Sequence, residues 1–239
     1  MSMVGFCGSR SLPPPSSALV SRVVGAMLAA PGDRGVAVGC CVGADRAIIS
    51  SVLAVPGSAS RLSVFAAFGP VSPPWPAPRV SAPGASSSVS WPSGVDAACR
   101  AGASIRWWAG GGPAVPMAGR LASRSAALVS TVAASGPGCG LVAFVRDACP
   151  PHLLPATSPS AAFYGHASGS WGSLALAAGL GLPVIVFPVS PSGYGDAAGT
   201  LLPAFWPGLW TPLSSRAWAG GFRFVANPPL QDDLFGPES

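Results

Sequence analysis

Four short segments rich in glycine, serine and arginine contain the residues best suited to bind a phosphate group. They are Gly8–Arg10, Gly39–Asp45, a helical pattern carrying Arg120 and Arg124, and Ser168–Ser173. Glycine lets the backbone approach a ligand closely, serine offers a hydroxyl group, and arginine binds phosphate through parallel N–H donors. These residue types predict a site for a phosphate-containing ligand.

The segment Ser168–Ser173 gives the strongest indication of the four. It precedes an apolar helical pattern, and the first N–H groups of a helix, with the positive end of its dipole, attract anions. Strand patterns on both sides favour a ligand site over an ordinary turn or helix cap. His166 is a candidate general acid or base, although a solvated loop histidine is the simpler interpretation. Trp107, Trp108 and Trp171 are candidates to stack a nucleobase.

The other candidate side chains also have structural alternatives. Arg120 and Arg124 lie four residues apart, so both could be exposed arginines on one helix face. Asp45 could cap the helix that follows it or bind a ribose hydroxyl, and capping is the simpler role. The residues predicted to bind the ligand are Gly8, Ser9, Arg10, Gly43, Asp45, Arg120, Arg124, Ser168, Gly169, Ser170, Gly172 and Ser173.

The elements that must position these segments alternate between apolar strands and helices. Strands are predicted at 4–7, 35–41, 61–68, 104–109, 141–145 and 183–189, and helices near 16–28, 44–53, 95–101, 117–134 and 172–180. This alternation predicts a Rossmann-like α/β fold, an open and mostly parallel sheet with helices on both faces. Ligands bind beyond the carboxyl ends of the strands of such a sheet, so the four segments are expected to meet there.

Three regions depart from this alternation. Residues 69–94 and 147–168 are rich in proline and polar or small residues, and we expect both to be irregular loops. The Rossmann-like domain is expected over 1–189. Residues 190–239 form an extension rich in aromatic residues, glycine and proline. It is predicted to cover the sheet edge or to bind a partner protein or a second copy of the chain.

The composition limits the chemistry available to the chain. All 13 basic residues are arginine, so the net charge of +5 rests on guanidinium groups and any lysine-dependent chemistry is excluded. A basic balance suggests a phosphate-bearing partner, and GC-rich coding bias is the alternative explanation for the missing lysine. Charged residues make up only 9% of the 239 residues, which favours self-association.

The cysteines and the apolar segments predict a cytoplasmic protein without metal or membrane span. The six cysteines show no CxxC spacing and only two histidines are present, so a zinc site is not expected. Cys7, Cys40, Cys41 and Cys139 are expected to be buried thiols in a reducing compartment. No signal peptide is expected, and the apolar stretch Leu174–Val189 is too short to cross a bilayer. No cofactor is expected, because the dinucleotide fingerprint GxGxxG is absent.

Four segments in order resemble the SLOG superfamily of Rossmann-like domains, which unites the DprA/Smf and LOG (Lonely Guy) proteins. They are GFCGSRSL at Gly5–Leu12, VAVGCCVGADRAIISSVL at Val36–Leu53, GRLASRSAALVS at Gly119–Ser130 and SGSWGSLALAAGLGLPVIVFP at Ser168–Pro188. The resemblance covers roughly residues 3–189. It implies that the glycines, serines and arginines named above line a pocket for the phosphate of a nucleotide or a nucleic acid.

One departure from the family bears on catalysis. LOG hydrolases carry a PGGxGTxEE-type segment whose carboxylates assist cleavage of the N-glycosidic bond. Ala175 and Leu176 stand at the corresponding positions, and the only glutamate of the chain is Glu238. Because an oxocarbenium-like transition state needs a carboxylate, no catalytic residue is assigned and the resemblance supports binding more than catalysis.

The sequence therefore predicts non-catalytic binding of a nucleotide or nucleotide-derived signal. Binding of single-stranded DNA, as in DprA, is the first alternative, although the arginines are dispersed rather than gathered in a stripe. A structural or assembly component with a vestigial site is the second alternative. A LOG-type phosphoribohydrolase is the least favoured. A homo-oligomer or a partner protein is expected to use the aromatic C-terminal extension.

Overall fold

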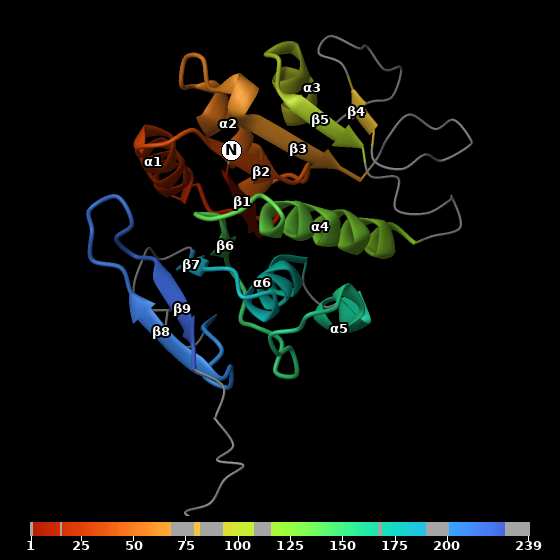
Figure 1. Ribbon diagram of the computed structural model, residues 1–239, viewed down its shortest axis with the longest axis vertical. Coiled ribbons are helices and arrows are strands. Elements are labelled where there is room, and N and C mark those ends of the chain that lie inside the picture. Colours follow the sequence, from red (N-terminus) through yellow and green to blue (C-terminus); the bar gives the residue numbers. More distant parts are fainter. Residues whose placement is uncertain are drawn as a thin grey trace, which may run out of the picture.

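A nine-stranded sheet organises the part of the chain that the structure, a computed structural model, describes: residues 2–14, 16–67, 79–81, 93–107, 116–166, 169–189 and 201–227 (Figure 1). The strand order is β4-β5-β3-β2-β1-β6-β7-β9-β8. The strands are β1 (Ser2–Gly8), β2 (Arg34–Val38), β3 (Leu62–Ala66), β4 (Arg79–Ser81), β5 (Ser104–Trp107), β6 (Gly140–Val145), β7 (Val184–Pro188), β8 (Gly208–Pro212) and β9 (Phe222–Ala226). The six strands β5, β3, β2, β1, β6 and β7 run parallel.

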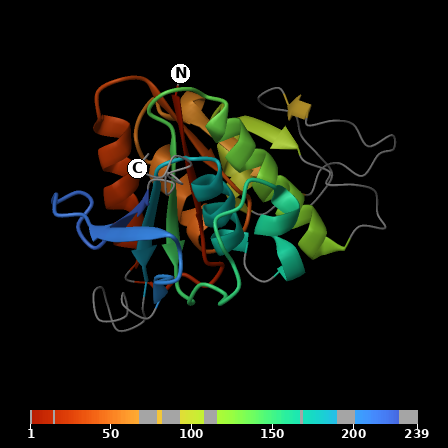
Figure 2. The same cartoon turned by 60° about the horizontal axis from the view of Figure 1, so that its bottom comes forward.

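Helices cover both faces of this sheet (Figure 2). The helices are α1 (Ser16–Ala29), α2 (Ala44–Leu53), α3 (Ser93–Arg100), α4 (Met117–Ala133), α5 (Pro159–Ala162) and α6 (Gly169–Gly179), with short 3-10 turns at Ala59–Arg61 and Tyr164–His166. Helices α1, α2 and α3 share one core with the sheet, and α4, α5 and α6 share the other. The predicted Rossmann-like fold is confirmed.

The central strand β1 marks the point where the strand order switches. It pairs in parallel with β2 on one side and with β6 on the other, although about 130 residues separate β1 from β6. Its side chains alternate between the two cores: Val4 and Phe6 face α1 and α2, whereas Met3 packs with α4 and α6. Because helices cover both faces of the sheet, the sequences of its central strands are nearly continuous apolar runs. The switch opens a crevice between β1 and β6 at their carboxyl ends.

The C-terminal extension adds an antiparallel hairpin to the sheet. Strand β9 pairs with β7 and with β8, which is the edge-cover arrangement among the alternatives expected for this region. Trp206 anchors it: its side chain is buried and its indole N–H donates to the carbonyl of Leu153 over 2.7 Å. Residues 190–200 and 228–239 lie outside the described part of the chain.

Several expected boundaries are wrong. Residues 147–168 contain the short helix α5, whose N-terminus is capped by the Ser158 hydroxyl. The 69–94 segment contributes strand β4 to the sheet edge. Strand β2 ends at Val38, so Cys40 and Cys41 belong to the following loop instead of the strand. Helix α6 starts at Gly169, three residues earlier than expected, because the Gly-Ser segment is itself the first helical turn.

Candidate functional site

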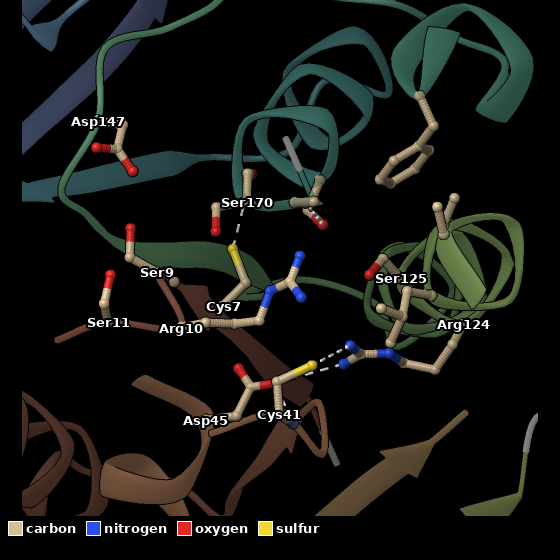
Figure 3. A pocket seen from close by; sticks show the side chains of 17 residues that line it. Cys7, Ser9, Arg10, Ser11, Cys41, Asp45, Arg124, Ser125, Asp147 and Ser170 are labelled. Atoms are coloured by element: carbon tan, nitrogen blue, oxygen red, sulfur yellow. Dashed lines mark hydrogen bonds and ion pairs between the residues drawn. The ribbon is translucent and has the colours of Figure 1, made fainter. Parts of the chain in front are cut away.

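A cavity of about 340 Å³ lies at the switch point between β1 and β6 (Figure 3). Its walls come from the loops after β1, β2 and β6 and from the first turns of α4 and α6. The lining residues are Cys7, Gly8, Ser9, Arg10, Ser11, Cys41, Asp45, Ala118, Leu121, Ala122, Arg124, Ser125, Asp147, Phe163, Gly169, Ser170 and Ser173. Such a volume lies within the usual range of small-molecule sites, roughly 300–1,000 Å³.

The loop after β1 is held in place by the loop after β6. The backbone N–H of Ser9 donates to the carbonyl of Phe144 over 2.9 Å. The backbone N–H of Arg146 donates to the Ser9 hydroxyl over 2.9 Å, and its guanidinium donates to the Ser11 hydroxyl over 2.8 Å. These hydrogen bonds restrain the loop on both sides of Arg10, so the backbone that carries the Arg10 side chain is held in place.

Arg10 itself is exposed and extends into the cavity (Figure 3). In the described part of the chain, no hydrogen bond or ion pair holds its guanidinium group. An arginine without a protein partner keeps all five N–H donors available for a ligand. Arg10 is therefore the cation of this cavity that is free to bind an anion.

Arg124 is in the opposite situation, at the floor of the cavity. Its side chain is 7% exposed, and its Nη1 lies 3.5 Å from Oδ2 of Asp45, which is 6% exposed. Its Nη2 donates to Sγ of Cys41 over 3.3 Å, and its Nε has no hydrogen-bond partner among the described residues. The expectation of an exposed arginine on the surface of α4 is thus wrong for Arg124, because the helix turns this position toward the loop after β2.

Asp45, in the first turn of α2, belongs to the same group of contacting residues as Arg124 and Cys41. Its carboxylate accepts the backbone N–H of Cys41 over 3.0 Å, so it fixes the loop before the helix and does not cap α2 itself. Burial raises the pKa of the Asp45 carboxyl, while the charge of Arg124 and the N–H of Cys41 act in the opposite direction. Both of these contacts are made by Oδ2 of Asp45, which is therefore held by the protein.

The first turn of α6 forms the roof of the cavity. Gly169 and Ser170 line it directly, and the first N–H groups of this 11-residue helix have no carbonyl partner within the helix. The carbonyl of Ser170 accepts the thiol of Cys7 over 3.9 Å, which ties the turn to β1. Burial raises the pKa of the Cys7 thiol, so it stays protonated and serves as a donor.

Some predicted ligand residues have packing roles instead. A Cβ on Gly43, where φ is +79°, would collide with the backbone of Ser9 and Arg10, and a Cβ on Gly8 would lie 2.6 Å from the carbonyl oxygen of Phe144. Gly172 packs against the ring of Phe163 in the same way. These glycines let neighbouring loops approach each other rather than a ligand.

The structure brings eight of the predicted residues together in the cavity: Gly8, Ser9, Arg10, Asp45, Arg124, Gly169, Ser170 and Ser173. Gly43, Gly172 and the half-buried Arg120 do not line it. Ser168, Trp108 and the side chains of His166 and Trp107 lie outside what the structure describes. Trp171 cannot stack a base: its side chain is 1% exposed and its indole N–H donates to the carbonyl of Asp147 over 2.8 Å.

The apolar residues of the cavity were not predicted from the sequence. Leu121, Ala122 and Phe163 are among them. The position of Leu121, three residues before Arg124 on α4, was a usable signal, because residues three or four apart share one helix face. Phe163 gave no signal, since it lies in a segment expected to be an irregular loop.

The cysteines are less uniform than expected. All six are free thiols; Cys40, Cys99 and Cys149 are buried, whereas Cys7, Cys41 and Cys139 are half-buried. Hydrogen bonding from Cys41 lowers the pKa of Cys40 to about 6, although burial of Cys40 opposes this effect. Within the described ranges, no three histidine, cysteine or acidic side chains are grouped closely enough to hold a metal ion.

The fold and the cavity define an α/β protein with a small-ligand cavity at the topological switch of a Rossmann-like sheet. Neither the protein-family models nor the curated protein sequences contain a significant match to this chain. Among the described helices, none has the length and apolar character needed to cross a bilayer.

Proposed function

We propose that this chain binds a nucleotide or nucleotide-derived ligand, without catalysis, through its phosphate in the cavity at the switch point. The observation that carries the proposal is the position of Arg10. Its guanidinium group, which has no partner among the described residues, extends into the same cavity that the first turn of α6 faces. A guanidinium group and a helix N-terminus converging on one space are the two protein groups best suited to an anion.

The cavity is lined by both polar and apolar residues, which suits a ligand with both characters. Arg10, Ser170 and the helix N-terminus would contact the phosphate. Leu121 and Phe163 would contact the less polar part of the ligand. Arg124 would contribute little charge, because Asp45 already neutralises it.

Two observations favour binding over catalysis. Asp45 is held by Arg124 and by the backbone of Cys41, so it is not poised to act on a substrate. The Asp147 side chain is 79% exposed and lies 3.9 Å from Nε of Arg146, so water and a neighbouring cation already surround this carboxylate. The resemblance of the four segments to the SLOG superfamily supports the same ligand class. The cytoplasmic location and an oligomeric state remain predictions.

The experiment is a titration calorimetry series with AMP, ADP-ribose, cyclic and linear oligoribonucleotides and short single-stranded DNA. Arg10→Gln is the test variant, because Arg10 supports no other part of the described structure. Arg216→Gln is the matched control, since Arg216 is exposed and does not line the cavity. Losing charged hydrogen bonds worth about 1.5–3 kcal/mol should weaken binding roughly 10- to 150-fold in Arg10→Gln only.

Other outcomes would redirect the proposal. Binding of single-stranded DNA alone, weakening steeply with salt, would favour the DNA-processing alternative. Equal ligand affinity of Arg10→Gln and the wild type would contradict the proposal that the phosphate binds through Arg10 in the cavity. Binding of no ligand, with a large assembly in light scattering, would favour a structural component.

A further inference from the structure

A second depression, of about 390 Å³, adjoins the cavity on the side of α5. We call it the α4–α5 groove. It is lined by Gly119, Ala122, Ser123, Pro159, Ser160, Phe163, Tyr164 and Gly165. Ala122 and Phe163 also line the cavity, so the two spaces lie side by side and share part of their lining.

The two spaces differ in chemistry. The cavity contains the charged side chains of Arg10, Asp45, Arg124 and Asp147. Among the described residues that line the groove, none is charged. The phosphate of a ligand therefore belongs in the cavity, and an uncharged group attached to it belongs in the groove.

Tyr164 gives the groove an aromatic surface open to solvent. Its residue is 86% exposed, whereas the adjacent Phe163 is 8% exposed and packs inward. The chain turns directly afterwards at Gly165, where φ is +66°, which leaves Tyr164 at the outside of the bend. An exposed aromatic ring beside a ligand site is suited to stack on a flat ring, since every nucleobase offers a π-face.

We propose that the α4–α5 groove holds the nucleobase of the ligand, stacked on Tyr164, while the phosphate occupies the cavity. This inference rests on the proposed function and narrows it to nucleoside phosphates, as opposed to sugar phosphates or free inorganic anions. Tyr164 takes the base-stacking role that the sequence suggested for Trp171, which is buried in the core. It is a specificity-determining residue, because stacking is the contact that a ligand without a base cannot make.

The test compares sugar phosphates that carry a base with one that does not. Binding of the four ribonucleoside monophosphates and of ribose 5-phosphate is measured by calorimetry for the wild type, Tyr164→Ala and Tyr164→Phe. Phe205→Ala is the control, because Phe205 is another exposed aromatic, 43% exposed, that lines neither space. Thermal unfolding of each variant checks that the fold is retained.

The expected result is a loss of nucleotide affinity in Tyr164→Ala of roughly 5- to 150-fold, the range of one stacked base at about 1–3 kcal/mol. Affinity for ribose 5-phosphate should stay unchanged, and Tyr164→Phe should retain nucleotide binding because the π-face remains. Phe205→Ala should behave like the wild type.

Three results would overturn the inference, and they can be told apart. Equal loss for nucleotides and for ribose 5-phosphate would mean that Tyr164 acts on the cavity rather than on a base. Nucleotide binding that is no tighter than ribose 5-phosphate binding, yet still lost in Arg10→Gln, would refute the groove and leave the proposed function standing. No binding of any of these five ligands, nor of any ligand in the calorimetry series of the proposed function, would refute both.

Discussion

Two arginines line the same cavity and differ in almost every other respect. Arg124, at the floor, is buried and paired with Asp45 and Cys41. Arg10, at the mouth, is exposed and unpaired in the described part of the chain. The floor group joins α4 to the loop after β2, whereas the Arg10 side chain forms no hydrogen bond or ion pair with any described residue.

A charged residue that lines a cavity is not for that reason available to a ligand. A buried cation whose partner is already in place offers an incoming anion little net attraction, and breaking that pair leaves an uncompensated buried charge. An exposed cation at the mouth loses only its contact with water. We therefore expect the floor to contribute to stability, and the proposed ligand binding to depend on the mouth.

The largest expected effect is the removal of one partner of the floor pair. Asp45→Ala or Arg124→Ala should each lower the free energy of unfolding by about 3–5 kcal/mol, because the remaining charge stays buried without compensation. The double variant Asp45→Ala/Arg124→Ala should lose clearly less than the sum of the single losses. Urea denaturation followed by circular dichroism measures all of them. Additive losses would show that the two side chains do not form a unit.

The fold was predictable from the sequence because its signal is repeated along the chain. Apolar strands alternate with helical patterns, and each repeat independently indicates a parallel sheet. The hairpin β8–β9 could not be recognised as part of that sheet. Its strands have mostly exposed or half-exposed residues, so the apolar pattern that identifies a buried strand is weak there.

The site was only partly predictable, for a different reason. The loops that meet at the switch point follow from the fold, which is why Ser9, Arg10 and Ser170 could be nominated together. The role of each residue depends on its distance to neighbours from other loops. Nothing in the sequence states that Arg124 turns toward Asp45, some eighty residues away, or that Gly43 lies against the backbone of Arg10.

A methyl group at Gly39 should disturb the floor without changing any charge. A Cβ there would collide with Nη1 of Arg124 and with Oδ2 of Asp45, so Gly39→Ala should cost about 1–3 kcal/mol of stability through overpacking. Gly25→Ala is the matched control, because a Cβ at Gly25 in α1 meets no atom within 4 Å. That change should be neutral or stabilise the helix by about 0.5–1 kcal/mol. Equal effects in denaturation would mean that the floor tolerates displacement of Arg124.

The pH dependence of the free energy of unfolding tests whether Arg124 stabilises the charged form of Asp45. Burial raises the pKa of Asp45 and Arg124 counteracts this, so Arg124→Met should raise that pKa further. A carboxyl whose pKa is higher in the folded state contributes its full stability at low pH and loses it as the pH rises. The loss caused by Arg124→Met should thus be larger at pH 8 than at pH 5, by on the order of 1 kcal/mol. Asp45→Asn/Arg124→Met, which has no carboxyl to titrate there, should remove the difference, and a flat profile for Arg124→Met would contradict it.

The smallest expected change in the free energy of unfolding is that of Arg10→Ala, at the mouth. It tests whether Arg10, unlike Arg124, contributes nothing to stability. Arg10→Ala removes a side chain that no described residue contacts by hydrogen bond or ion pair, so the free energy of unfolding should change by no more than about 0.5 kcal/mol. The loop itself should persist, because backbone and hydroxyl bonds from Ser9 and Ser11 hold it to Phe144 and Arg146. Ser9→Ala supplies the contrast: it removes the acceptor of the Arg146 N–H and should cost about 1 kcal/mol. A loss in Arg10→Ala as large as that in Ser9→Ala would mean that Arg10 also supports the structure, and a cation that supports the structure could not be assigned to the ligand alone.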